Sequence, residues 1–186
     1  MHKEIEIKIQ VKEFETFQNK LKEQGCVLTE PIAQDDMVFV NYEGEYTLFP
    51  EGANYLRIRQ TKEKSFFTLK RGEEMDSIER ETVISDPNQM RDALLFMGYK
   101  EAVRVKKVRT KTNLKGYEIC FDSVEELGSF IEIEKITDED TEVVRKEMLD
   151  FLESFGVDTA ERVHNGYDTL VYLKNKSKNE QNIHKK

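Results

Sequence analysis

Apolar and charged residues alternate at the start of the chain. Between Glu4 and Val11 every second residue is isoleucine or valine, and the residues between them are Glu, Lys or Gln. Because successive side chains of a strand point to opposite faces, this pattern predicts a strand with one apolar and one charged face. The charged face of such a strand normally points to water. The alternation is of interest because it returns along most of the chain.

The same period of two predicts further strands. They cover residues 36–42, 55–61, 65–71, 77–85, 101–112, 116–123 and 128–136. A short charged turn at residues 62–64 joins two of them and predicts a hairpin. Residues 43–54 carry Gly44, Pro50 and Gly52, so this segment is expected to be a loop.

Three other stretches repeat apolar residues at helical spacing, and a glycine follows each of them. They cover residues 11–24, 87–97 and 139–155. Asp86 followed by Pro87 predicts the start of the second helix, and Thr137 is expected to cap the third. Residues 174–186 are polar and lysine-rich without a period, so we expect a disordered tail after one domain over residues 1–173.

Length and charge limit the function. A chain of 186 residues suits a single domain. A net charge of -8 argues against a general nucleic-acid binder, but it allows a small anionic ligand in a local basic pocket. Apolar runs are too short for a membrane span, and the N-terminus lacks the apolar core of a signal peptide. We therefore expect a cytoplasmic protein that binds neither nucleic acid nor membrane.

Histidine and cysteine offer no metal-binding pattern. The sequence has 3 histidines, which are scattered, and 2 cysteines without a paired spacing. Cys26 and Cys120 lie among apolar residues, and we interpret both as packing residues.

Most of the predicted strands carry two or more charges on one face. The basic residues on these faces are Lys8, Arg57, Arg59, Lys70, Lys107 and Arg109. The acidic residues are Glu4, Glu6, Glu79, Glu81, Glu118, Asp122, Glu132 and Glu134. Two interpretations stay open. The sheet could expose its charged face to water, or it could curl so that the charges line an interior, where they need partners or a bound ligand.

The residue types suit a phosphate ligand. One guanidinium group can donate two parallel hydrogen bonds to phosphate oxygens, and lysine supplies a point charge. Carboxylates near both ends of the chain could hold Mg²⁺, which takes few protein ligands and shares its other positions with phosphate and water.

This ordered set of residues resembles the CYTH superfamily, also called triphosphate tunnel metalloenzymes. The resemblance begins with Glu4-x-Glu6-x-Lys8 and covers roughly residues 1–173. It continues through Leu56-Arg57-Ile58-Arg59, Phe67-Thr68-Leu69-Lys70, Glu79-Arg80-Glu81, Lys107-x-Arg109, Asp122-Ser123-Val124 and Leu127-Gly128-x-Phe130-Ile131-Glu132-Ile133-Glu134. Gln34-x-Asp36 and the last segment are most similar to the class IV adenylyl cyclase branch.

The resemblance implies an α+β fold in which a closed eight-stranded antiparallel β-barrel, the triphosphate tunnel, is flanked by helices. It implies Mg²⁺ or Mn²⁺ at Glu4, Glu6 and Glu134, assisted by Asp122 and Glu132. It implies a triphosphate held by Lys8, Arg57, Arg59, Lys70, Lys107 and Arg109. Catalysis would fall to Glu4, Glu6, Lys8 and Glu134, with acidic support from Glu79, Glu81, Glu118 and Asp122. A homodimer is also implied by the cyclase relatives.

Three functions follow as alternatives. The first is a cyclase that converts ATP to 3′,5′-cyclic AMP and pyrophosphate. The second is hydrolysis of inorganic or thiamine triphosphate, and the third is a non-catalytic protein that binds triphosphate or polyphosphate. Val38 stands where many relatives carry a tyrosine that helps to activate water, which disfavours hydrolysis unless Tyr42 or Tyr46 substitutes. No histidine matches a motif position, and no general base is identified.

Overall fold

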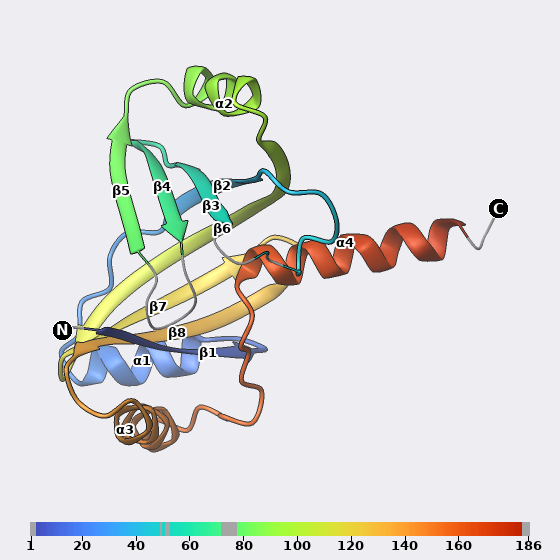
Figure 1. Ribbon diagram of the computed structural model, residues 1–186. Helices are drawn as coiled ribbons and strands as arrows, with labels where there is room; N and C mark the ends of the chain where they lie inside the picture. The colour runs from blue at the N-terminus through green and yellow to red at the C-terminus, as the bar shows by residue number, and fades with distance from the viewer. Residues whose placement is uncertain (1–2, 49, 51–52, 72–77, 184–186) are drawn as a thin grey trace. The chain divides into compact units, whose positions relative to one another are not determined.

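A computed structural model describes residues 3–48, 50, 53–71 and 78–183 (Figure 1). The strands are β1 (Lys3–Val11), β2 (Ile32–Val40), β3 (Asn54–Gln60), β4 (Ser65–Arg71), β5 (Ile78–Ile84), β6 (Lys100–Leu114), β7 (Tyr117–Val124) and β8 (Gly128–Thr137). The helices are α1 (Glu15–Glu23), α2 (Pro87–Phe96), α3 (Thr141–Ser154) and α4 (Tyr167–Ile183). No helix in this part of the chain is long and apolar enough to cross a membrane.

The fold is α+β, with the strands in one eight-stranded antiparallel sheet of order β1-β8-β7-β6-β2-β3-β4-β5. Within the described ranges, no pairing joins β1 to β5, so hydrogen bonds leave the sheet open. The closed barrel is therefore not confirmed. The chain forms two compact units, one from residues 1–32 and 107–164 and the other from residues 33–106 and 165–186. The boundary falls within β6.

In the first unit, the apolar faces of β1, β7 and β8 pack against α1 and α3. The register places Ile7 opposite Ile133, which in turn lies opposite Ile119. These isoleucines form a core with residues of both helices, including Leu21 and Met148, which are fully buried. Each such side chain contributes about 1.5–3 kcal/mol by leaving water. The packing fixes the register of β1, because a slip of one residue would turn its charges into the core.

The second unit has its own core under α2. Phe39, Ile58 and Leu94 are almost completely buried there, with Met37 and Leu56 beside them. The predicted start of α2 is confirmed, because Asp86 Oδ1 accepts hydrogen bonds from the backbone N–H groups of Asn88 (2.9 Å) and Gln89 (3.0 Å). In β3, Leu56 and Ile58 face this core, and the odd-numbered residues between and beside them face the other side of the sheet.

Two helices begin later than predicted. α1 begins at Glu15 rather than near residue 11, because β1 continues through Val11. α3 is capped by Asp140 rather than Thr137, and its carboxylate accepts from the N–H groups of Glu142 and Val143. Thr137 ends β8 instead. Aspartate and threonine are both good caps, so spacing alone does not choose between them.

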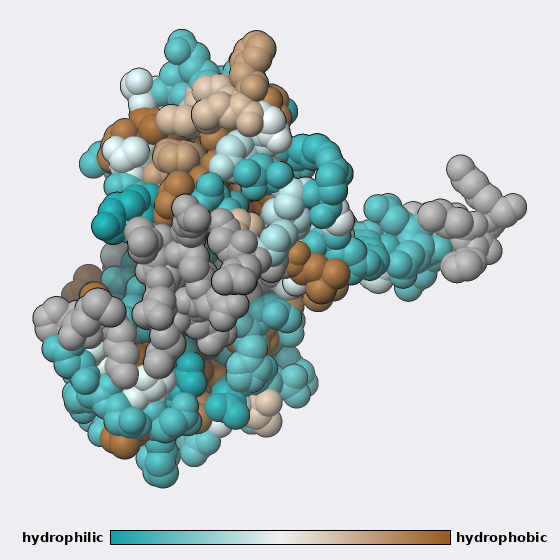
Figure 2. All heavy atoms as spheres, in the orientation of Figure 1, coloured by the Kyte–Doolittle hydropathy of each residue, from teal (hydrophilic) through white to brown (hydrophobic). Residues whose placement is uncertain are grey.

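The structure also differs from the sequence prediction after Leu173, where it continues α4 to Ile183 instead of a disordered tail. Only the first turns of α4 carry buried residues, such as Tyr167 and Val171. The surface of the later turns is mostly hydrophilic (Figure 2). Because the described later turns bury no apolar side chain, their sequence lacks the period by which a packed helix is recognised.

Candidate active site

The charged face of the first unit is assembled by strand register. The pairing of β1 with β8 places Glu6 opposite Glu134 and Lys8 opposite Glu132. The pairing of β6 with β7 places Arg109 opposite Asp122. Since the alternate residues of β1, β7 and β8 pack on α1 and α3, these charges share the face turned away from the helices.

A buried ionic network holds the middle of this face. Arg109 Nε donates to Asp122 Oδ1 at 2.7 Å, and its Nη2 donates to both Asp122 and Glu132. Lys107 Nζ lies 3.2 Å from Asp122 Oδ2. Burial tends to raise the pKa of Glu132, but the nearby Arg109 and Lys8 charges outweigh it and lower that pKa. The predicted metal-assisting carboxylates of Asp122 and Glu132 are thus already engaged by cations.

Lys8 extends the network toward the start of β1. Its Nζ lies 3.2 Å from Glu132 Oε1 and 3.1 Å from Glu6 Oε1. Burial disfavours the charged form of Lys8, yet the two carboxylates raise its pKa above the ordinary value. Lys8 therefore stays charged and ties Glu6 to the buried network.

Beyond Lys8 lies a cluster of three acidic residues, Glu4, Glu6 and Glu134. Burial and the neighbouring Glu4 and Glu6 charges raise the pKa of Glu134 to about 8. A carboxyl group that retains its proton beside two other carboxylates marks a position that favours a cation. The donors are all oxygen, which matches the preference of Mg²⁺ and Mn²⁺. The residue types of this cluster suit a divalent metal, whereas, among the described residues, the donor atoms that lie within 4.8 Å of one another are those of Glu118, Cys120 and Glu134.

The raised pKa of Glu134 gives a pH dependence of stability. Between its ordinary value of 4.5 and about 8 the folded chain binds more protons than the unfolded chain, so this group's stabilisation is lost as the pH rises through that window. Without metal, we expect the free energy of unfolding to fall more from pH 5 to pH 8 in the wild type than in Glu134→Gln. Urea unfolding at the two pH values in EDTA measures this difference. An equal change in the free energy of unfolding of both proteins would contradict the raised pKa of Glu134.

Cys120 departs from the sequence interpretation. Its neighbours Ile119 and Phe121 face the core, so its thiol lies on the charged face, 3.8 Å from Glu118 Oε1. Donor atoms of Glu118, Cys120 and Glu134 lie within 4.8 Å of one another. Burial raises the pKa of the thiol to about 12, so it stays protonated near neutral pH. A cysteine in a buried strand is normally interpreted as an apolar packing residue. The pairing of β7 with β8 is what places Cys120 among carboxylates.

The second unit carries the other predicted phosphate ligands on β3 and β4. Arg59 forms a bidentate ion pair with Asp36, in which Nε donates to Oδ1 at 2.7 Å and Nη2 donates to Oδ2 at 2.6 Å. Lys70 Nζ lies 2.8 Å from Glu79, and both side chains are more than 40% exposed, at 42% and 43%. Lys70 can therefore exchange Glu79 for another anion at little cost.

Arg57 is held more loosely than Arg59. Its Nη2 lies 3.3 Å from Thr68 Oγ1, 3.5 Å from Glu81 and 4.0 Å from Glu79. Its buried Nε has no hydrogen-bond partner within the described residues. Among the predicted phosphate ligands, Arg57 thus offers a guanidinium edge that an anion could occupy.

The tyrosines considered as substitutes at Val38 have other partners. Val38 is buried and lies opposite Arg57. Tyr46 donates its hydroxyl proton to Asp168, and the Tyr42 hydroxyl donates to the Tyr46 carbonyl at 2.8 Å. Burial and the Asp168 charge raise the pKa of Tyr46. Sequence reasoning missed Asp168, which lies 122 residues from Tyr46 and matches no motif.

Comparison with known proteins supplies a family. A family model described as CYTH domain matches residues 2–167. A Methanocaldococcus jannaschii protein named as a candidate adenylate cyclase is 28% identical over 171 residues, which are 88% of this chain and 95% of that one. A Pyrococcus horikoshii structure matches with a TM-score of 0.74 and 26% identity over 91% of this chain and 99% of its own. A Hippeastrum protein described as a candidate adenylyl cyclase with a dominant triphosphatase activity has a TM-score of 0.66 and 18% identity, over 94% and 96%.

Proposed function

Since the chain belongs to the CYTH domain family, we propose that it is a metal-dependent enzyme acting on a nucleoside triphosphate. The reaction we propose is cyclisation of ATP to 3′,5′-cyclic AMP with release of pyrophosphate. The observation that carries the proposal is the gathering of Glu4, Glu6 and Glu134 on one face, where burial and the two neighbouring carboxylates raise the pKa of Glu134.

Glu4, Glu6 and Glu134 would hold the metal. When bound, a divalent cation neutralises charge that develops on phosphoryl oxygens and orients the phosphate chain. Lys8 keeps Glu6 in place and adds positive charge beside the cluster. Asp122 holds Lys107 and Arg109 in fixed positions, so these cations need no reorganisation as the reaction proceeds. Positioning and charge neutralisation account for most of the catalysis of phosphoryl chemistry.

Arg57 is the residue of the second unit that we propose to bind phosphate. Its unpaired Nε and its long contacts leave donors for phosphate oxygens. We expect Arg57→Ala to weaken tripolyphosphate binding by about 10- to 100-fold, since a hydrogen bond to a charged group contributes about 1.5–3 kcal/mol. The shift in melting temperature on adding tripolyphosphate and Mg²⁺ measures this loss. Arg145→Ala, on the exposed face of α3, is the matched control. If tripolyphosphate raised the melting temperature of both variants equally, Arg57 would not be a phosphate ligand.

Cyclisation and hydrolysis differ in the attacking oxygen. Val38 stands where many relatives carry a tyrosine that helps to activate water in some triphosphatases, and the Tyr42 and Tyr46 hydroxyls already donate to other groups. These observations support cyclisation. The Hippeastrum protein, described with a dominant triphosphatase activity, has the same fold, so the fold alone does not choose between the two reactions.

Product analysis tests the proposed reaction. The purified chain is incubated with ATP and, separately, with tripolyphosphate, in the presence of Mg²⁺ or Mn²⁺, and the products are separated by chromatography. Cyclic AMP and pyrophosphate from ATP would support cyclisation. Orthophosphate from tripolyphosphate, without cyclic AMP from ATP, would establish hydrolysis instead. Binding without either product would establish a triphosphate-binding protein that is not an enzyme.

A further inference from the structure

The second unit has an apolar continuation of the face that carries its phosphate ligands. Arg104 Nε binds Asp35 Oδ1 at 2.7 Å, so these two residues of β6 and β2 share one face of the sheet. Their neighbours Val103 and Asp36 therefore share the opposite face. Asp36 binds Arg59 on that face. Val103 thus lies on the same side of the sheet as Arg59 and, by alternation along β3, as Arg57.

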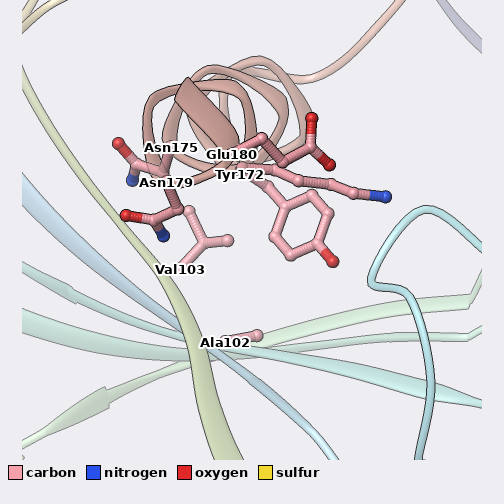
Figure 3. Close-up of a pocket in the computed structure, with 7 residues that line it drawn as sticks. Ala102, Val103, Tyr172, Asn175, Asn179 and Glu180 are labelled. Atoms are coloured by element: carbon pink, nitrogen blue, oxygen red, sulfur yellow. The ribbon is translucent and has the colours of Figure 1, made fainter. Parts of the chain in front are cut away.

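Helix α4 runs over this apolar position and leaves a cavity of about 350 Å³ that is open to solvent, with Asn175, Asn179 and Glu180 exposed. Val103 and Ala102 line the cavity from β6, and Tyr172, Asn175, Lys176, Asn179 and Glu180 line it from α4. In Figure 3 the amides of Asn175 and Asn179 lie on one side of the Val103 side chain, and the Tyr172 ring lies on the other. A cavity of this volume is at the lower end of the range for small-molecule sites.

Tyrosines connect the cavity with the phosphate ligands. Tyr55 lies opposite Lys70 and on the same face of β3 as Arg57. Burial and the Asp168 charge of α4 raise the pKa of Tyr55, which places that helix within electrostatic reach of β3. The Tyr172 ring, which lines the cavity, lies 5.2 Å from the Tyr46 ring, and Tyr46 donates to Asp168. Packed side chains therefore link β3 with the wall of the cavity, through Asp168, Tyr46 and Tyr172.

The polar groups of the cavity suit an uncharged ring rather than more phosphate. Lys176 is already paired with Glu45, and Glu180 adds a negative charge that repels phosphate. The two asparagine amides each present a donor and an acceptor, the combination that pairs with the edge of adenine. Tyr172 offers an aromatic surface on which a base can stack.

We propose that the cavity under α4 binds the base of the nucleoside triphosphate, with Asn175 and Asn179 contacting the edge of the base and Tyr172 its face. This inference rests on the proposed function, because it names the part of the substrate that lies beyond the phosphates. It makes α4 a determinant of specificity for nucleoside triphosphates over tripolyphosphate. In this unit, the phosphates themselves are left to Arg57.

Adenosine binding tests the cavity separately from the phosphate ligands, because adenosine carries no phosphate. Saturation-transfer NMR with the full chain should detect adenosine binding, and the double variant Asn175→Ala/Asn179→Ala should weaken it by about tenfold or more. Alanine favours helix, so this variant retains α4. Asn88→Ala, an exposed asparagine on α2, is the matched control and should bind as the wild type does. Absence of adenosine binding to the wild type, or equal binding by the double variant, would overturn the inference.

Kinetics of the same variants give a second test. The double variant should lower kcat/KM for ATP by about tenfold or more while changing the affinity for tripolyphosphate by less than about twofold. An equal loss of ATP turnover and of tripolyphosphate affinity would overturn the assignment to the base. If the wild type binds adenosine through these amides but turns over neither substrate, the cavity assignment stands and the proposed enzymatic function fails.

Discussion

Replacing Asp122 with alanine is expected to lower the free energy of unfolding by about 3–5 kcal/mol, because removing one member of a buried ion pair leaves an uncompensated charge. The Asp122 side chain is 0% exposed and binds both Lys107 and Arg109. Its loss leaves Lys107 without this contact and removes the bidentate partner of Arg109. Glu132 remains as an acceptor for Arg109. Urea unfolding followed by circular dichroism measures the change.

An exposed pair with similar geometry provides the control. Arg104 binds Asp35 through Nε and Nη2 at 2.7 and 2.8 Å, but the two side chains are 49% and 30% exposed. Water screens such a pair, and Asp35→Ala should cost less than about 1 kcal/mol. A similar loss in both variants would show that the network around Asp122 is not more important to stability than a surface pair.

Replacing Glu6 with alanine should have the largest effect on activity. Glu6 belongs to the carboxylate cluster and anchors Lys8, so its loss removes a proposed metal ligand and frees a cation beside it. We expect turnover at saturating Mg²⁺ to fall by about 100-fold or more. The Glu6 side chain is 44% exposed and Lys8 keeps Glu132, so the melting temperature should change by only a few degrees, about the effect of 1 kcal/mol.

Initial rates over a Mg²⁺ titration separate a lost metal ligand from a lost fold. A weakened metal site requires more Mg²⁺ for half-maximal rate, whereas a partly unfolded variant loses activity at every concentration. Glu30→Ala, an exposed glutamate before β2, should match the wild type in both respects. Full activity of Glu6→Ala in the presence of metal would show that the metal lies elsewhere.

The period of apolar residues was sufficient to predict most of the elements. Alternation located β1 and β8, because each buries one face on α1 and α3, and Asp86 with Pro87 located the start of α2. Closure of the sheet could not be predicted in this way, since alternation states which face is apolar but not how strands at the edges meet. Helix α4 was not predicted, and beyond Leu173 its described turns bury no apolar residue that would impose a pattern.

The candidate site was predictable in its residue types but not in its pairings. The sequence placed Asp122, Glu132 and Arg109 on charged faces, and it could not show that they neutralise one another. Strand register decides which charges pair, and the register itself is set by contacts between residues far apart in the sequence. Cys120 and Asp168 were missed for the same reason, because each gains its role from neighbours on other elements.

We propose that the carboxylate cluster of Glu4, Glu6 and Glu134 makes this chain a metal-dependent enzyme for triphosphates. The most direct test is a ³¹P NMR time course of the purified chain with ATP and with tripolyphosphate, recorded with Mg²⁺ and again after addition of EDTA. We predict that the triphosphate signals of at least one substrate disappear with Mg²⁺ and that EDTA stops the reaction. Persistence of both substrates with Mg²⁺, or turnover that continues unchanged in EDTA, would contradict the claim.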